Sequence, residues 1–157
     1  MDGENIGLKE RQKLETREPT EAEWATGLSA MRHKMLAETH ARIILGGRVD
    51  KFKGDMPGIA EEALYSLEAK QPLYVMGGFG GCARDVAEAI GVLEPNGVRE
   101  WPGRDKFNSF KGKKLNNGLS AEENRVLANT PHVDQAIILI IRGLTKAALG
   151  PHGGMVA

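Results

Sequence analysis

The chain has 157 residues, the usual length of one compact domain. Its 21 Lys and Arg residues balance its 21 Asp and Glu residues, which excludes both the basic footprint of a general nucleic-acid binder and a strongly acidic, disordered composition. Glycine departs from an ordinary globular composition, because 20 glycines are about 13% of the chain against a typical ~7%.

Several other classes of protein are disfavoured, namely membrane-spanning, secreted and metal-binding proteins. No apolar run reaches the roughly 18 residues that a membrane-spanning helix needs, and the N-terminus lacks the apolar core of a signal peptide. Cys82 is the single cysteine, and the four histidines show neither an HExxH motif nor clustering with it. We therefore expect a cytoplasmic protein without a metal site and without membrane or nucleic-acid partners.

The first half of the chain predicts a helix and a strand. Residues 1–27 are a polar lead-in or linker, in which a helix would begin near Pro19 with Trp24 as its anchor. From residue 28 the spacing of Leu28, Met31, Met35 and Leu36 predicts one face of a helix. Residues 41–45 are a short apolar run that ends in Gly46-Gly47, typical of a buried strand followed by a tight loop.

A second strand–loop–helix unit follows. Pro57 suits the first turn of a helix that would run to about Lys70, and residues 73–76 form a second buried strand. The segment Gly77–Gly81 follows directly, and a helical pattern from Ala83 ends at Gly91. Two such units in succession predict an α/β fold, a Rossmann-like parallel sheet flanked by helices.

The last third reads as a loop and two helices. Residues 95–118 form a long basic loop with six bases and two acids between Arg99 and Lys114. Ser120 and Glu123 form a capping box for a short helix. A final helix would start near Pro131; residues 137–141 would also suit a strand, but the helical spacing is favoured. The expected domain covers residues 28–145, followed by a flexible tail, 146–157.

The sharpest local signal is the glycine segment. Gly77, Gly78, Gly80 and Gly81 lie between a strand and a helix, where backbone N–H groups and the helix dipole favour phosphate. Phe79 would stack on a base or ribose, and Arg84 is added to this ligand site. The alternative is that the glycines serve tight strand–helix packing.

A second candidate site joins Gly46, Gly47 and Arg48 with the segment Gly58–Glu62. The guanidinium of Arg48 would pair with phosphate, and Glu61 or Glu62 would accept from ribose hydroxyls. The alternative is that both acids only favour the helix dipole and face water. The same ambiguity holds for Arg32 and Lys34 and for the basic loop, which would either close over phosphates or face solvent. Cys82 would be a small buried residue or a reactive thiol.

Four segments together resemble the SLOG superfamily, which includes nucleotide-sensing domains of TRPM channels and of prokaryotic defence proteins. They are residues 31–35 (MRHKM), 41–47 (ARIILGG), 57–62 (PGIAEE) and 71–81 (QPLYVMGGFGG). The resemblance covers roughly residues 28–144. It implies binding of a nucleotide or an ADP-ribose-derived signal, of the ADP-ribose or cyclic ADP-ribose type, without turnover.

Enzymes of the LOG type in this superfamily release a base from a nucleoside 5′-monophosphate with an Arg and the Glu of a PGGxGTxxE motif. By position these are Arg32 and Glu62. Ten residues separate Gly46-Gly47 from Gly58, Ile59 replaces the motif's Thr, and no Pro precedes Gly46. These departures favour a binding domain over a phosphoribohydrolase.

Superfamily members begin with a strand and a glycine-rich loop that residues 1–27 do not contain. We therefore expect a fold without its first strand, as part of a longer protein or with that strand supplied from elsewhere. The resulting hypothesis is a nucleotide sensor in anti-phage defence that forms homo-oligomers and controls a fused or partner effector. The alternatives are a LOG-like hydrolase and a structural assembly module.

Overall fold

The computed structural model describes residues 17–97 and 99–148. In chain order, its elements are α2 (Glu21–Glu38), β1 (Arg42–Leu45), α3 (Gly58–Glu68), β2 (Leu73–Met76), the 3₁₀ turn η1 (Gly77–Phe79), α4 (Gly81–Ala89), the 3₁₀ helix η2 (Arg104–Phe110), α5 (Ala121–Asn129) and α6 (Val133–Ala148). The predicted alternation of helices and strands is confirmed. Residues 1–16 of the predicted lead-in and 149–157 of the predicted tail lie outside the described residues.

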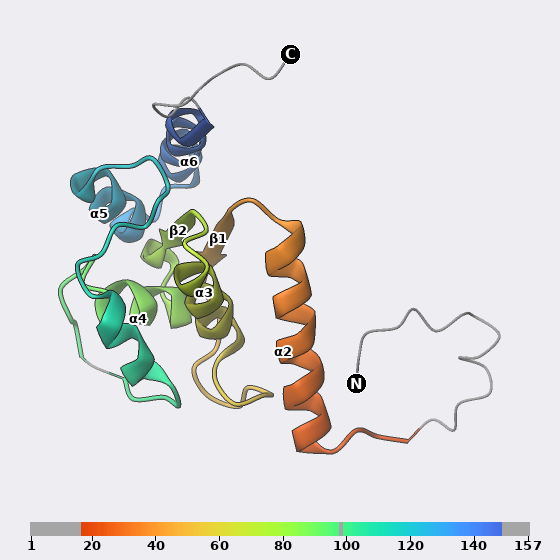
Figure 1. Ribbon diagram of the computed structural model, residues 1–157. Helices are drawn as coiled ribbons and strands as arrows, with labels where there is room; N and C mark the ends of the chain where they lie inside the picture. Colours follow the sequence, from red (N-terminus) through yellow and green to blue (C-terminus); the bar gives the residue numbers. More distant parts are fainter. Residues whose placement is uncertain (1–16, 98, 149–157) are drawn as a thin grey trace, which may run out of the picture.

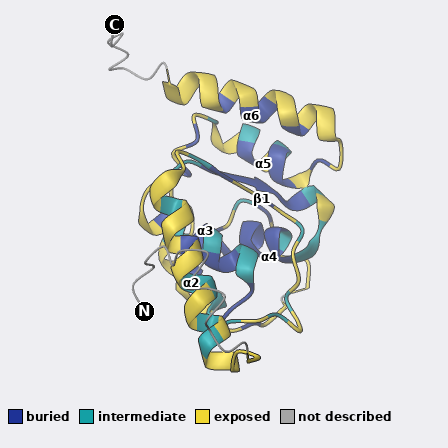
Figure 2. Cartoon of the chain, turned by 90° about the vertical axis from the view of Figure 1, so that its right-hand side faces the viewer, coloured by how far each residue is buried: buried dark blue, intermediate teal, exposed yellow. Residues whose placement is uncertain are grey.

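The two strands form a parallel sheet in which Ile43 is opposite Tyr74 and Leu45 is opposite Met76. Helices cover both faces of this sheet. Figure 1 shows α3 and α4 on one side of the strands, α5 and α6 on the other, and α2 outermost beside α3. Figure 2 shows the same layers from the side of β1. This is the parallel α/β architecture that the sequence predicted, with two strands among the described residues.

The two faces of the sheet carry separate apolar clusters. On the α3/α4 face, Ile44, Leu73 and Val75 pack with Ala60, Ala63, Val86 and Ala87. On the other face, Tyr74 and Met76 pack with Leu127 of α5 and with Ala136, Leu139 and Ile140 of α6. The Tyr74 hydroxyl is buried and donates to the Asn117 carbonyl at 2.8 Å. Both faces of β2 are therefore buried.

The two edges of the sheet differ. Beyond β2, the N–H of Leu73 donates to the carbonyl of Leu115 at 3.0 Å, so the chain itself covers that edge. Beyond β1, Ile43 and Leu45 are about half exposed. Among the described residues, no backbone group pairs with the outer side of Ile43 or Leu45. β1 is therefore an open edge strand.

Helix ends follow the sequence signals closely. The predicted capping box at Ser120 and Glu123 is present, and Thr20 and Glu23 form another at the start of α2. Gly91 follows α4 with φ +75°, the left-handed conformation that glycine adopts without strain. Residues 137–141 are helical, as favoured, within α6.

The predicted basic loop is more ordered than its composition suggests. It contains η2, and Trp101 and Phe107 are buried in edge-to-face contact with ring centroids 5.7 Å apart. The reading of this segment as solvent-facing sequence is therefore wrong for its centre. Two widely spaced aromatic residues anchor it, and such an anchor leaves no periodic signal in the sequence.

Candidate functional site

The two predicted glycine sites meet at the carboxyl ends of β1 and β2. The N–H of Cys82 donates to the carbonyl of Gly47 at 2.9 Å, and the N–H of Ala83 donates to that of Gly46 at 2.8 Å. A Cβ on Gly81 would lie 2.5 Å from the Gly47 oxygen, so this close approach requires glycine. Two donors of the first turn of α4 are thus bound to protein carbonyls rather than free for an anion.

Gly77 and Gly78 are needed for packing. A Cβ on Gly77 would lie 2.7 Å from the Ala128 oxygen, and one on Gly78 would collide with the carbonyl of Thr130. Both contacts are with the carboxyl end of α5. Gly80 differs, because it has φ +74° and open space where its side chain would be. The packing interpretation therefore describes Gly77, Gly78 and Gly81, but not Gly80.

Three further residues of this region, Phe79 in η1 and Cys82 and Arg84 in α4, have different surroundings. Phe79 is 40% exposed. Arg84 is half-buried and its Nε lies 3.2 Å from a carboxylate oxygen of Glu88. Cys82 is buried, and burial raises the pKa of its thiol to about 12, which leaves it protonated at neutral pH.

The first turn of α3 is arranged differently. Pro57 precedes this 11-residue helix, and no side chain caps it. The guanidinium of Arg32 lies over this turn, since a Cβ on Gly58 would lie 2.5 Å from its Nη2. Backbone N–H groups at a helix start beside a guanidinium favour an anion, and Glu61 and Glu62 in the same turn offset part of that positive charge.

Arg32 is held by a buried network between α2 and α3. It forms an ion pair with Glu61, whose carboxylate also accepts from the hydroxyls of Ser29 and Tyr65. Burial by itself would raise the pKa of Glu61, but these hydrogen bonds and the charge of Arg32 outweigh it and lower that pKa. Glu61 therefore neither faces water nor is free to bind ribose; it positions Arg32.

Glu62 points to a second arginine. Its carboxylate lies 3.2 Å from Nη1 of Arg42 and 3.8 Å from Nε of Arg32. That Nε is buried and has no hydrogen-bond partner. A buried donor without a hydrogen-bond partner is costly, and the charge of the nearby Glu62 carboxylate offsets part of that cost.

Arg32 and Glu62 both line a cavity of about 370 Å³ between α2, the loop after β1 and the first turn of α3. Its walls are Trp24, Leu28, Arg32, Arg48, Phe52, Lys53, Gly58, Ile59 and Glu62. The structure thus brings together four predicted residues, Arg32, Arg48, Gly58 and Glu62. Gly47 borders this group, because a Cβ there would lie 2.6 Å from Ile59.

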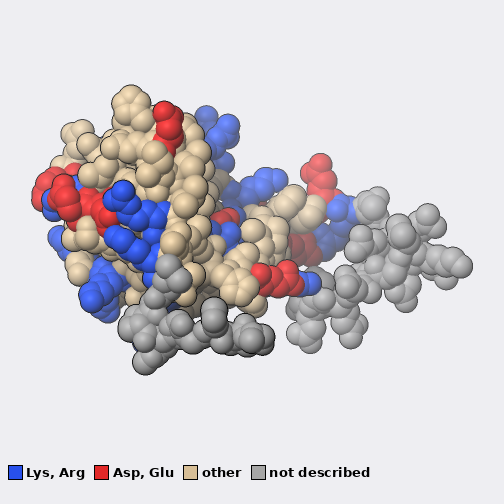
Figure 3. Space-filling model, turned by 90° about the horizontal axis from the view of Figure 1, so that it is seen from above, with Lys and Arg blue, Asp and Glu red and all other residues tan. Residues whose placement is uncertain are grey.

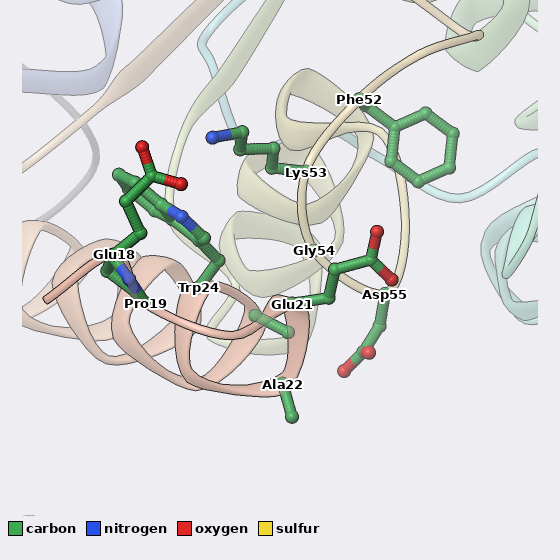
Figure 4. A pocket seen from close by; sticks show the side chains of 10 residues that line it. Glu18, Pro19, Glu21, Ala22, Trp24, Phe52, Lys53, Gly54 and Asp55 are labelled. Atoms are coloured by element: carbon green, nitrogen blue, oxygen red, sulfur yellow. The ribbon is translucent and has the colours of Figure 1, made fainter.

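Sequence reasoning missed the aromatic and basic wall of this cavity. Trp24, Phe52 and Lys53 also line a neighbouring cavity of about 570 Å³, shown in Figure 4. The Lys53 ammonium lies 4.2 Å from the centre of the Trp24 ring. Trp24 was expected only as a helix anchor. An aromatic residue at 24 and a Phe-Lys pair at 52–53 carry no spacing signal that would join them.

The basic segment contacts α4 and does not line the cavity. Arg99 contacts the buried Asp85 of α4, with Nη2 3.0 Å from Oδ1. Burial raises the pKa of Asp85 above its usual value in spite of Arg99. Lys34, on α2, is exposed, and no contact joins it to the cavity.

Among residues 17–97 and 99–148, no group of three or more His, Cys, Asp or Glu is placed to hold a metal ion. No helix in the same ranges is long and apolar enough to cross a membrane.

Comparisons with known proteins identify the family. A sequence model of the family described as SLOG cluster2 matches residues 2–101, well over half of the chain. No curated protein and no solved structure matches it. The SLOG resemblance of the sequence is therefore confirmed. The chain belongs to the SLOG cluster2 family and is a Rossmann-like, nucleotide-related domain.

Proposed function

We propose that this domain is a cytoplasmic sensor that binds a nucleotide-derived ligand of the ADP-ribose or cyclic ADP-ribose type in the 370 Å³ cavity. The observation that carries the proposal is the convergence of the uncapped first turn of α3 with Arg32, Arg48 and Lys53 on this space. A phosphate group is the anion that suits such a site.

The rest of the cavity supports a whole nucleotide. Trp24 and Phe52 offer aromatic surface on which a base would stack. The carboxylate of Glu62, at the opposite wall, would accept hydrogen bonds from ribose hydroxyls. A second phosphate, as in ADP-ribose, would extend past Ile59 toward Gly46, where the space that a side chain would take is open.

Binding without turnover is favoured by the remodelled motif. Ile59, which lines the cavity, stands where LOG-type enzymes carry a phosphate-binding Thr. We propose that the ligand changes assembly or activates a fused or partner effector, in prokaryotic anti-phage defence. A homo-oligomer would transmit such a change between copies.

Calorimetry tests the proposal with ADP-ribose, cyclic ADP-ribose, NAD and AMP against the purified, folded chain. We expect heat from at least one of them, with binding about tenfold weaker in Arg48→Ala and unchanged in Lys106→Ala, an exposed base outside the cavity. Silence with all four ligands would overturn the proposal.

A second function is favoured by one contact, because Arg32 and Glu62 line the same cavity with 3.8 Å between Nε and Oε1. These are the two residues that a LOG-like phosphoribohydrolase would use. This alternative predicts release of free adenine from AMP, abolished by Glu62→Ala. Absence of release by a chain that still binds AMP would remove it.

The third alternative, a structural assembly module, draws on the packing of Gly77 and Gly78 against α5. It predicts that no nucleotide binds to a chain that folds and assembles normally. Calorimetry on the unmodified chain, with sedimentation of the same sample, separates it from the sensor.

A further inference from the structure

The cavity of about 570 Å³ beside the candidate site differs from that site in charge. The two cavities have three lining residues in common, which are Trp24, Phe52 and Lys53. The larger cavity is also lined by three carboxylates, those of Glu18, Glu21 and Asp55. The smaller one is lined by three bases and one acid, which are Arg32, Arg48, Lys53 and Glu62. Two adjoining spaces of opposite charge therefore lie side by side, and we call the larger one the acidic cavity.

The carboxylates of the acidic cavity come from two separate elements. In Figure 4, the side chains of Glu18 and Glu21 come from the start of α2, whereas those of Lys53 and Asp55 come from the loop after β1. None of the ion pairs within the described residues includes these three acids. Their negative charge is therefore balanced in the cavity only by the Lys53 ammonium. The molecular surface seen from above likewise shows acids and bases gathered in separate places (Figure 3).

The aromatic wall of the acidic cavity already holds a cation. The Lys53 ammonium lies 4.2 Å from the centre of the Trp24 ring, within the range of a cation–π contact. Trp24 is 37% exposed, so a molecule from solvent can reach its ring. An indole face surrounded by carboxylates attracts an organic cation, and a flat cationic ring also gains stacking contact with the indole.

We propose that the acidic cavity binds a cationic aromatic ring of the same ligand whose phosphate lies in the 370 Å³ cavity. This inference rests on the proposed function, from which it takes the position of the phosphate. The ligand class is then a nucleotide with a positively charged base, such as oxidised NAD with its pyridinium ring. A cavity of this size accommodates such a ring with its ribose.

Lys53 connects the two halves of the ligand site. Because it lines both cavities, its ammonium would pass from the Trp24 ring to the phosphate when a cationic ring stacks on Trp24. A neutral ring would gain nothing from the carboxylates and less from the indole face. The site should therefore discriminate between ligands by the charge of the ring.

Oxidised and reduced NAD test this discrimination, because they share both phosphates and the adenine and differ in the charge of the nicotinamide ring. Calorimetry on the whole, folded chain should show oxidised NAD binding about tenfold more tightly. The double variant Glu21→Gln, Asp55→Asn should weaken oxidised NAD about fivefold and leave reduced NAD unchanged. The matched control is Glu38→Gln, Asp50→Asn, which removes two exposed acids of the same elements outside both cavities.

A further variant addresses the aromatic wall. Trp24→Leu should bring the affinities for the two forms within about twofold of each other, in a chain whose circular dichroism is unchanged. Equal affinities of the unmodified chain for both forms would overturn this inference and leave the proposed function intact. So would binding of ADP-ribose without binding of oxidised NAD, or a preference that Glu21→Gln, Asp55→Asn does not reduce. Absence of heat with every nucleotide would overturn both proposals.

Discussion

The first turns of α3 and α4 invite comparison, because each helix follows a strand and glycines, yet their backbone donors have different surroundings. In α4, Cys82 and Ala83 donate to the carbonyls of Gly47 and Gly46. In α3, no side chain caps the helix, and Arg32 lies over its first turn. A glycine-rich turn is therefore not in itself an anion site; what matters is whether its donors are already bound.

The largest expected effect tests the scaffold of the α3 site. Glu61→Ala should lower the free energy of unfolding by about 3 kcal/mol, because it removes the nearer of the two carboxylates that balance the buried Arg32 and leaves the Ser29 and Tyr65 hydroxyls without their acceptor. Urea unfolding measures this loss. Glu122→Ala is the matched control, since its ion pair with Arg125 is exposed and should contribute little. Equal losses in the two variants would show that the buried network is not what holds α2 to α3.

The next largest effect tests whether the glycines before α4 serve packing against α5. Gly78→Ala should cost about 2–3 kcal/mol of unfolding free energy, because its methyl group would collide with the carbonyl of Thr130. Gly27→Ala, in α2, is the control, since a Cβ there meets nothing within 4 Å. Thermal unfolding followed by circular dichroism measures both. A Gly78→Ala chain of undiminished stability would contradict the packing interpretation.

A smaller effect separates the two helices as ligand sites. Arg48→Ala and Lys53→Ala should each weaken binding of the ligand identified by calorimetry about tenfold, the usual effect of one charge-assisted hydrogen bond. Arg84→Ala on α4 should leave the affinity unchanged, because Arg84 already pairs with Glu88. The opposite pattern would move the site to the first turn of α4.

The smallest effect is on pH dependence, where the two helices should act in opposite directions. The pKa of Glu61 is lowered in the folded chain, so its contribution to stability is present above the unfolded value of 4.5 and is lost as pH falls through the folded value. The pKa of Asp85 is raised, so protonation of Asp85 stabilises the folded chain in acid. Unfolding free energies between pH 6 and pH 3 should therefore fall less steeply in Glu61→Gln and more steeply in Asp85→Asn than in the unmodified chain.

The local elements could be predicted because their signals are local. The capping box at Ser120, the start at Pro57 and the glycine after α4 each act within one helical turn, and each marks a helix end in the structure. Strand β2 was predicted over the residues that form it, since a short apolar run between Pro72 and glycines has few alternatives. The 3₁₀ helix η2 was missed, because its anchors Trp101 and Phe107 follow no period.

The candidate site could be predicted only in part. Arg32, Arg48, Gly58 and Glu62 were singled out as residues, and they do line one cavity. From the sequence alone, Glu61 and Glu62 were equivalent candidates for binding ribose hydroxyls. Their side chains leave α3 about 100° apart, so one turns into the buried network with Arg32 and the other toward the cavity.

The sequence by itself determined that this is a parallel α/β chain of the SLOG type with glycines at its strand ends, because periodicity, caps and turn residues act over a few neighbouring positions. Only the tertiary structure decided which glycines pack and which donors stay free. It also decided that Trp24, Phe52 and Lys53 join the cavity, and that one face of α6 stays uncovered. Those outcomes depend on contacts between residues distant in the chain, and such contacts leave no pattern in the order of the amino acids.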